Sequence, residues 1–150
     1  MTSLELESTI ATIFQEIEKQ VPEYENSPDD WDECQGHVAA CIITEDGKVY
    51  GKLFGSDKLR QRKYFNIAWK KASQVWITGM KTGAHEKVVF GGEMDPEDSP
   101  IELPDLIGWV GGQPIRIDDK TLLSIGFSGF QGVNDLGIVE KAVKAVLNNS

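Results

Sequence analysis

The sequence has few of the residues that bind metals or form disulfides, with two cysteines and two histidines among 150 residues. It also lacks a long apolar run, because the longest, Val38–Ile43, falls far below the roughly 20 residues needed to cross a bilayer. The N-terminal stretch MTSLELESTI contains glutamates and no basic region, unlike a secretory signal peptide. Together these absences predict a cytoplasmic protein with reduced cysteines.

Positive charge is scarce as well. The chain carries 24 acidic and 15 basic residues, which gives a net charge of −9. Phosphate backbones and anionic lipid surfaces would repel such a protein, so we expect neither nucleic acid nor membrane partners. The hydrophobic fraction of 40% is enough for one core, and we interpret residues 1–150 as a single domain.

Three segments have apolar residues at helical spacing. The first is Ser3–Gln20, which Thr2 or Ser3 can cap, and the second is Gln61–Met80, which should end at Gly79. The third closes the chain and carries Leu136, Val139, Val143, Val146 and Leu147. Polar, proline-containing residues 22–36 are interpreted as a connecting loop.

Two pairs of strands are predicted by apolar, β-branched runs on either side of a turn. One pair flanks Asp46-Gly47, a dipeptide typical of tight hairpins, and its first strand is apolar on both faces and therefore central in the sheet. The other pair is PIRID and TLLSIGFSG, joined by a turn at 118–120. Residues 86–92 are a short strand or a buried turn, and the acidic, proline-rich stretch 93–105 is a loop or lid.

The predicted order gives an α+β fold in which helices cover both faces of an antiparallel sheet, an arrangement that resembles a profilin-like α-β-α sandwich. The motifs GWVGGQPIRID and LLSIGFSGFQGVNDLGIVEKAV, preceded by VAACIITEDGKVYGKL and IAWKKASQV, resemble the GlcG/HbpS family of haem-degrading, PduO C-terminal-like domains. The resemblance covers about 38–147, and its motifs include Lys71-Ala72 and Gly111-Gly112 with the following Pro-Ile.

The family resemblance implies cytosolic homo-oligomers, some of which bind haem or take part in corrinoid metabolism. It places a ligand pocket between the second helix, Gly111-Gly112 and the corner at Ser128-Gly129, with Asp135 on the helix that follows. Where the family has a second glycine in its Ser-Gly-Gly turn, this chain has Phe130, whose ring should either wall the pocket or turn into the core.

The glycine-rich corner Gly126–Gly132 has two interpretations. Backbone N–H groups at the start of a helix can hold a carboxylate or phosphate, whereas glycines can also serve only to turn and pack the chain. Asp135 fits the first helical turn, where its negative charge is favourable and would compete with an anionic ligand.

Lys71 lies at the margin of the apolar stripe of the second helix. Its ammonium is expected to pair with a ligand carboxylate at the pocket edge, or else its stem covers apolar surface and its ammonium stays in water. Trp69 and Trp76, on the same stripe, are interpreted as core or subunit interface. His37 is the better placed of the two histidines to ligate haem iron, and no pattern of zinc or calcium ligands is present.

Three function classes remain open from the sequence. The first is a cytosolic homo-oligomer that binds a small molecule, with haem or a related tetrapyrrole as the ligand class that the resemblance implies. The second is an enzyme acting on haem or a small hydroxy or keto acid, although no catalytic residue can be assigned, since Ser128 lacks the Gly-x-Ser-x-Gly elbow. The third is a profilin-like protein-interaction module.

Overall fold

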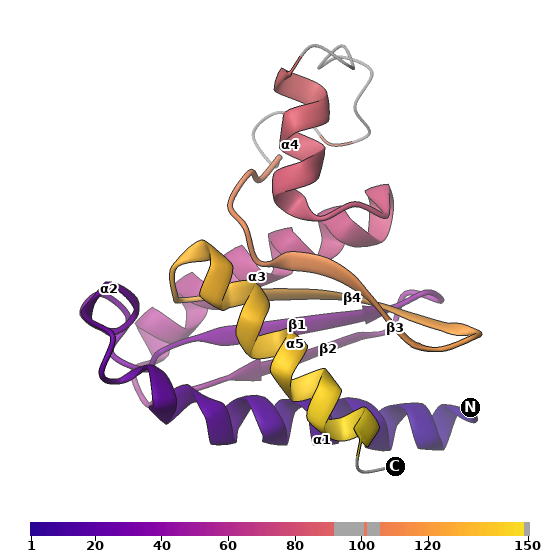
Figure 1. The fold of residues 1–150 in the computed structure, drawn as a ribbon, viewed down its shortest axis with the longest axis horizontal. Coiled ribbons are helices and arrows are strands. Elements are labelled where there is room, and N and C mark those ends of the chain that lie inside the picture. Colours follow the sequence, from indigo (N-terminus) through magenta and orange to yellow (C-terminus); the bar gives the residue numbers. More distant parts are fainter. Residues whose placement is uncertain (92–100, 102–105, 149–150) are drawn as a thin grey trace.

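The protein is a layered α+β structure in which helices lie on both sides of one sheet (Figure 1). In the computed structural model, residues 1–91, 101 and 106–148 are described. The elements in chain order are α1 (Ser3–Gln20), η1 (Val21–Tyr24), α2 (Pro28–Trp31), β1 (Ala39–Thr44), β2 (Val49–Leu53), α3 (Lys58–Thr78), α4 (Thr82–Phe90), β3 (Gly112–Asp118), β4 (Thr121–Ser128) and α5 (Gly132–Asn148).

The four strands form one antiparallel sheet in the order β2-β1-β4-β3. Strand β1 is central and buried along its whole length, as its apolar sequence predicts. Helix α3 packs on one face of the sheet, and α1 and α5 pack against each other on the other side (Figure 1). The predicted α+β class, with helices on both faces, is therefore confirmed.

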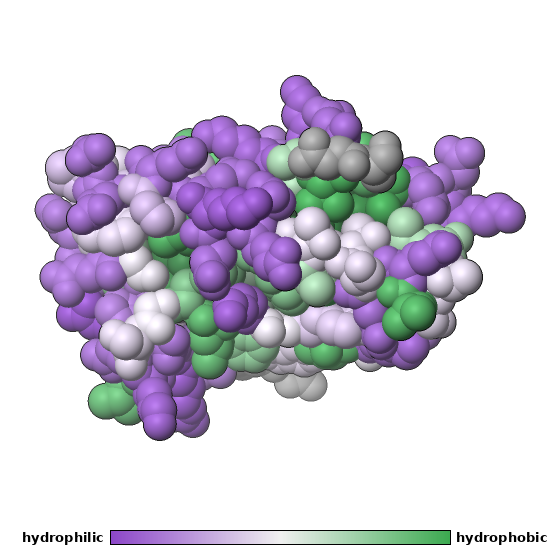
Figure 2. Space-filling model, turned by 90° about the horizontal axis from the view of Figure 1, so that it is seen from below, coloured by the Kyte–Doolittle hydropathy of each residue, from purple (hydrophilic) through white to green (hydrophobic). Residues whose placement is uncertain are grey.

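Helix α1 has the predicted bounds because its sequence supplies both a cap and an apolar stripe. The Thr2 side chain accepts the Glu5 N–H, and the Glu5 carboxylate accepts the Thr2 N–H, which makes a capping box. Ile10, Ile13 and Ile17 are buried against the core. Seen from the side on which α1 lies, the surface is mostly hydrophilic, with hydrophobic side chains in patches between the polar ones (Figure 2).

A row of small residues lies across the sheet under α3. The strand register places Gly51 opposite Cys41, Cys41 opposite Gly126, and Gly126 opposite Gly112. A Cβ at Gly126 would lie 2.2 Å from the Ala68 carbonyl oxygen, so no larger residue leaves room for the α3 backbone. The row therefore lets the α3 backbone lie close against the sheet.

Several local predictions need correction. The 22–36 stretch is not a plain loop, because it contains η1 and α2. The hairpin predicted at Asp46-Gly47, by contrast, is confirmed, since β1 and β2 pair antiparallel on either side of it and Gly47 has a φ of 88°. Residues 86–90 belong to helix α4 rather than to a strand, and the predicted lid at 93–105, apart from Ile101, lies outside the described residues.

The interpretation of Trp69 and Trp76 on α3 as core residues also needs correction. Trp69 and Trp76 are 42% and 45% exposed, whereas Tyr64, Lys71 and Gln74 are buried. The tryptophans are therefore not core residues. Of the helices within the described ranges, none is both long and apolar enough to span a membrane.

We predict that Gly126→Ala destabilises the protein by about 1–3 kcal/mol, because the new methyl group must push the α3 backbone away from the sheet. Gly137→Ala is the matched control, since a Cβ there meets no atom within 4 Å. Replacing a helical glycine at such an open position should stabilise by up to about 1 kcal/mol. Urea unfolding measures both changes, and an unchanged midpoint for Gly126→Ala would contradict the close approach of α3.

Candidate functional site

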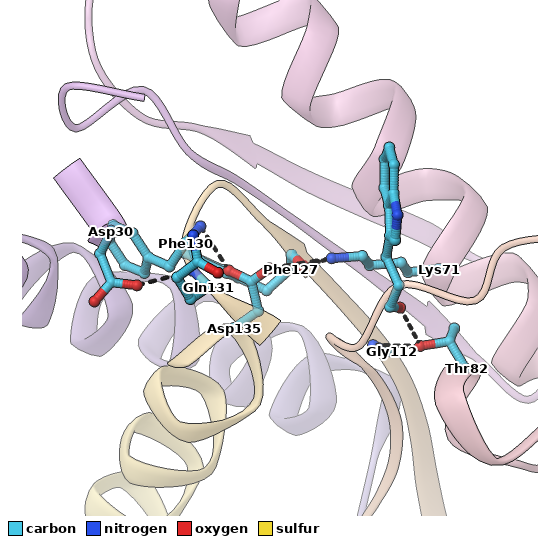
Figure 3. Close-up of polar contacts among 9 residues, drawn as sticks. Asp30, Lys71, Thr82, Gly112, Phe127, Phe130, Gln131 and Asp135 are labelled. Atoms are coloured by element: carbon cyan, nitrogen blue, oxygen red, sulfur yellow. Dashed lines mark hydrogen bonds and ion pairs between the residues drawn. The ribbon is translucent and has the colours of Figure 1, made fainter. Parts of the chain in front are cut away.

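The candidate site is built around a buried ion pair between α3 and α5. The Lys71 Nζ donates to the Phe127 carbonyl oxygen at 2.8 Å and lies 3.1 Å from the Asp135 Oδ2 (Figure 3). The Asp135 Oδ1 accepts the Phe130 N–H at 2.8 Å. The side chains of Lys71 and Asp135 are only 2% and 4% exposed, so water screens this pair very little.

Burial shifts the pKa of both partners towards their neutral forms. It raises the pKa of the Asp135 carboxyl to about 7 and lowers the pKa of the Lys71 ammonium. The attraction between the two groups works against both shifts, as does the Phe130 hydrogen bond for Asp135. Both shifts act in the direction that makes proton transfer from Lys71 to Asp135 less unfavourable than it is in water.

A glycine makes room for the ammonium. Gly111 has a φ of 133°, and a Cβ at this position would lie 2.6 Å from both the Lys71 Nζ and the Phe127 carbonyl oxygen. Gly111 is therefore required by the ion pair rather than by an approaching ligand. Gly112 lies beside it, where its N–H donates to the Thr82 Oγ1 at 3.3 Å (Figure 3).

The corner between β4 and α5 does bind carboxylates, but they belong to the chain itself. Besides Asp135, the buried Asp30 of α2 accepts the Gln131 N–H at 2.8 Å and the Asn134 amide at 2.7 Å. Its carboxylate also accepts the Ser27 hydroxyl at 2.7 Å. Two of the N–H groups that the sequence offered to an external anion are thus already used.

A cavity of about 390 Å³ opens beside the ion pair, and we name it the Lys71 pocket. Its buried wall includes Tyr64, Lys71, Ser128 and Asp135. Its other lining residues, from exposed to partly or fully buried, are Glu33, Lys63, Ile67, Trp109, Val110, Gly129, Phe130, Gln131 and Gly132. Glu33 and Lys63, both exposed, lie 3.7 Å apart and form an ion pair.

Of the ligand-binding residues predicted from the sequence, Lys71, Ser128, Gly129, Phe130 and Asp135 line this pocket, whereas Gly111 and Gly112 pack behind it. Lys71 is buried rather than at a solvent-exposed margin, which corrects the alternative in which its ammonium stays in water. Its ammonium already has a carboxylate partner, and it does not extend into water.

Phe130 belongs to the core. Its ring stacks on Tyr24 with centroids 4.5 Å apart and contacts the Phe127 ring at 5.5 Å. The Phe130 backbone N–H, by contrast, donates a hydrogen bond to the Asp135 carboxylate. Of the two roles predicted for the ring, the structure therefore supports packing into the core.

His37 lies outside the pocket, and both of its ring nitrogens are used. Its Nδ1–H donates to the Cys34 carbonyl oxygen at 3.0 Å, and its Nε2 accepts the Asp57 N–H at 3.0 Å. The ring thereby ties the chain before β1 to the start of α3. This corrects the interpretation of His37 as an iron ligand, and the described residues contain no cluster of three His, Cys, Asp or Glu side chains able to hold a metal ion.

Sequence reasoning missed the segment that carries Trp109 to the pocket. The Gln74 amide exchanges two hydrogen bonds of 2.8 Å with the Ile107 backbone, and the Thr82 hydroxyl donates to the Trp109 carbonyl oxygen at 2.6 Å. Gln74 is a polar residue that is buried on α3 along with Ala68 and Val75. A polar residue among the buried positions of a helix is the sequence signal for this contact, but an analysis of hydrophobic periodicity does not use it. The indole of Trp109, at 64% exposure, is held at the pocket by these bonds to its backbone.

Comparison with known proteins identifies the fold. No family model matches the sequence, and no match is found among the curated proteins. Among solved structures, the Klebsiella pneumoniae protein ORFY, described as DUF336, is 14% identical over 93% of this chain and 88% of that chain, with a TM-score of 0.70. The PduOC–haem complex is 18% identical over 89% of this chain and 91% of that chain, with a TM-score of 0.62.

A double mutant of Streptomyces reticuli HbpS is also similar, at 14% identity over 87% of this chain and 84% of that chain, with a TM-score of 0.55. These structural neighbours are the ones that the sequence resemblance named, so the resemblance is confirmed at the level of the fold. At such identities the likeness shows the fold alone.

We predict that removing either partner of the ion pair destabilises the protein by about 3–5 kcal/mol, because the other charge is left buried without compensation. The variants are Lys71→Met and Asp135→Asn, and the double variant should lose less than the sum of the two. The interaction free energy, measured by urea unfolding of all four proteins, is expected to be about 0.5–3 kcal/mol. Additive losses would contradict a direct pair.

The same variants give a pH dependence of known sign. In Lys71→Met the Asp135 carboxyl is buried without a cation, so its pKa in the folded protein lies above the value of about 3.9 in the unfolded chain. A raised folded pKa gives stability that is present at low pH and lost as the pH rises. The single variant should therefore lose stability relative to the double variant from about pH 4 to beyond pH 7, because the Lys71 charge that lowers the Asp135 pKa is gone.

Proposed function

We propose that this protein binds a small molecule in the Lys71 pocket. The observation that carries the proposal is a cavity of about 390 Å³ with charged and hydroxyl groups in its buried wall. Ligand sites commonly have volumes of about 300–1,000 Å³ and place a few polar groups among apolar ones. Here Ile67, Val110 and the aromatic Tyr64 and Trp109 supply the apolar surface.

The polar groups of the buried wall favour a ligand that carries oxygen acceptors. The Ser128 and Tyr64 hydroxyls make no hydrogen bond to another described residue, and the Lys71 ammonium has three N–H groups but only two acceptors within the described chain. Each unused donor gains a partner when a carbonyl, carboxylate or hydroxyl oxygen enters the pocket. Asp135 disfavours a second carboxylate close to it, so a ligand carboxylate is better placed towards Lys63.

Haem or a related tetrapyrrole is the ligand class that the structural neighbours support, since one of them is a PduOC–haem complex. The pocket residues fit such a group in part. Trp109 and Tyr64 offer aromatic surface, Lys63 offers a cation for a propionate, and Tyr64 is of a residue type that serves as an axial iron ligand. The described lining contains no histidine, cysteine or methionine.

Titration with haemin, followed through the Soret band, tests this assignment. We expect saturable binding that Trp109→Ala weakens about 2- to 10-fold, the equivalent of an aromatic contact of about 0.5–1.5 kcal/mol. Trp76→Ala is the matched control, because this tryptophan is also exposed but does not line the pocket.

Native mass spectrometry of the purified protein tests separately whether a small molecule binds and whether that molecule is a tetrapyrrole. A retained small molecule that is not haem, with no Soret response, would reject the tetrapyrrole and keep the small-molecule site. No retained ligand, no haemin binding and no effect of Trp109→Ala together would remove the Lys71 pocket as a binding site.

We also propose that the protein is a cytoplasmic homo-oligomer and that a second copy covers the outer surface of α3 and β2. Trp69, Trp76 and Ile77 of α3 and Val49 and Leu53 of β2 are large hydrophobic side chains left exposed. The Trp76 indole reaches the β1–β2 turn, where its Nε1–H donates to the Glu45 carbonyl oxygen at 3.4 Å. Strand β2 is at the sheet edge, so its outer backbone groups are available to pair with another strand.

Light scattering tests the assembly against the monomer mass of 16.6 kDa. We expect a larger particle for the wild type and a shift towards the monomer for Trp69→Lys with Trp76→Lys, because two charges cannot be buried in an apolar contact. Trp109→Lys, on another part of the surface, should leave the assembly intact. A wild-type protein of 16.6 kDa at micromolar concentration would overturn the proposal.

The enzyme alternative is favoured by one specific observation, the contact of a buried amine and a buried carboxyl at a pocket. Groups of this kind supply nucleophiles and proton carriers in enzymes. The interaction-module alternative rests on the same exposed tryptophans that we assign to self-association.

A further inference from the structure

The Lys71–Asp135 pair is more elaborate than the packing of α3 requires. Buried ion pairs are often no more stabilising than apolar side chains of similar volume. Here a Cβ at Gly126 would lie 2.9 Å from the Lys71 Cβ, and a Cβ at Gly111 would lie 2.6 Å from the Nζ, so the whole side chain needs glycines beside it. The result is a primary amine in the wall of a cavity, with a proton acceptor 3.1 Å away.

Three neighbouring features give this amine the surroundings of a nucleophile. Lys71 lines the Lys71 pocket, the Asp135 carboxylate lies 3.1 Å from its Nζ, and the Ser128 and Tyr64 hydroxyls of the same lining can donate to an oxygen of a bound molecule. Burial also lowers the pKa of Lys71, which increases the fraction of free amine.

We propose that Lys71 forms an imine with the carbonyl carbon of a small aldehyde or ketone bound in the Lys71 pocket. The inference rests on the proposed small-molecule site and names the ligand class that this site would take. It adds a covalent step that binding alone does not need.

Imine formation requires only Lys71, Asp135 and the carbonyl compound. The Lys71 ammonium passes a proton to the Asp135 carboxylate, and the free amine attacks the carbonyl carbon to form a carbinolamine. Asp135 then returns its proton to the carbinolamine oxygen, which leaves as water while the carbon–nitrogen double bond forms. The product is a cationic iminium beside the Asp135 carboxylate, so the buried pair keeps its charges and no oxidant or reductant is needed.

Reductive trapping tests the proposal on the whole protein. The protein is incubated with acetone, an uncharged ketone, as the probe and with sodium cyanoborohydride, and the modified lysines are located by peptide mass spectrometry. We expect the initial rate at Lys71 to exceed that at Lys70 by roughly tenfold or more, since a ketone bound in the Lys71 pocket is held beside the amine, whereas Lys70 meets it only by collision. Lys70 is the matched reference because it is the preceding residue on α3 and is exposed to solvent.

Variants separate a reactive amine from a lysine that is merely accessible. Lys71→Arg retains a cation for Asp135 but cannot form an imine, so the adduct at this position should be lost, whereas Lys70→Arg should leave the Lys71 rate unchanged. Asp135→Asn should slow trapping at Lys71 because the proton acceptor is lost. Circular dichroism checks that each variant is folded, and the comparison of lysines within the wild type stands even if a variant does not fold.

Failure of this inference differs from failure of the proposed function. Trapping at Lys71 that is no faster than at Lys70 would overturn the imine proposal, while a small molecule retained in native mass spectrometry would still support the binding site. Selective trapping at Lys71 that survives Asp135→Asn would also overturn the proton-transfer step.

Discussion

Lys71 and Asp135 place opposite charges in contact in a part of the protein that water hardly reaches, and the surrounding structure depends on keeping them together. The pair joins α3 to α5 across the end of β4, because the same ammonium also binds the Phe127 carbonyl oxygen. The glycines at 111 and 126 are part of the same geometry, since a Cβ at 111 would meet the ammonium and the Phe127 carbonyl oxygen, and a Cβ at 126 would meet the α3 backbone. The pocket beside the pair is a consequence of the same geometry.

Much of the fold follows from local patterns. Helix α1 has a cap, a capping glutamate and an apolar stripe that all indicate the same bounds, and β1 is apolar on both faces, as a central strand must be. Helix α4 escaped prediction because residues 86–90 are too few for a period to be read, and the hydrogen bonds of Thr82 with the backbone of Trp109 and Gly112 are visible in the tertiary structure alone. The term profilin-like stays a prediction.

The candidate site was harder to predict because it depends on residues that are distant in the sequence. Spacing on a helix places Lys71 at the edge of an apolar stripe, but only the tertiary structure supplies Asp135, 64 positions away, as its partner. Hydropathy alone also predicts the wrong environment for two residues of α3, because Trp69 is exposed and Gln74 is buried. The glycine-rich corner was placed correctly, and its occupants proved to be carboxylates of the chain itself.

The attachment of α2 to the first turn of α5 also bears on how the chain folds. The bonds from Gln131 and Asn134 to Asp29 and Asp30 join residues 101 to 104 positions apart. Contacts of such separation form late, because the entropy of closing a long loop is lost before any bond is gained. During synthesis, Asp30 leaves the ribosome before Gln131 and Asn134 do, so its carboxylate can be paired with them only after the start of α5 has been made.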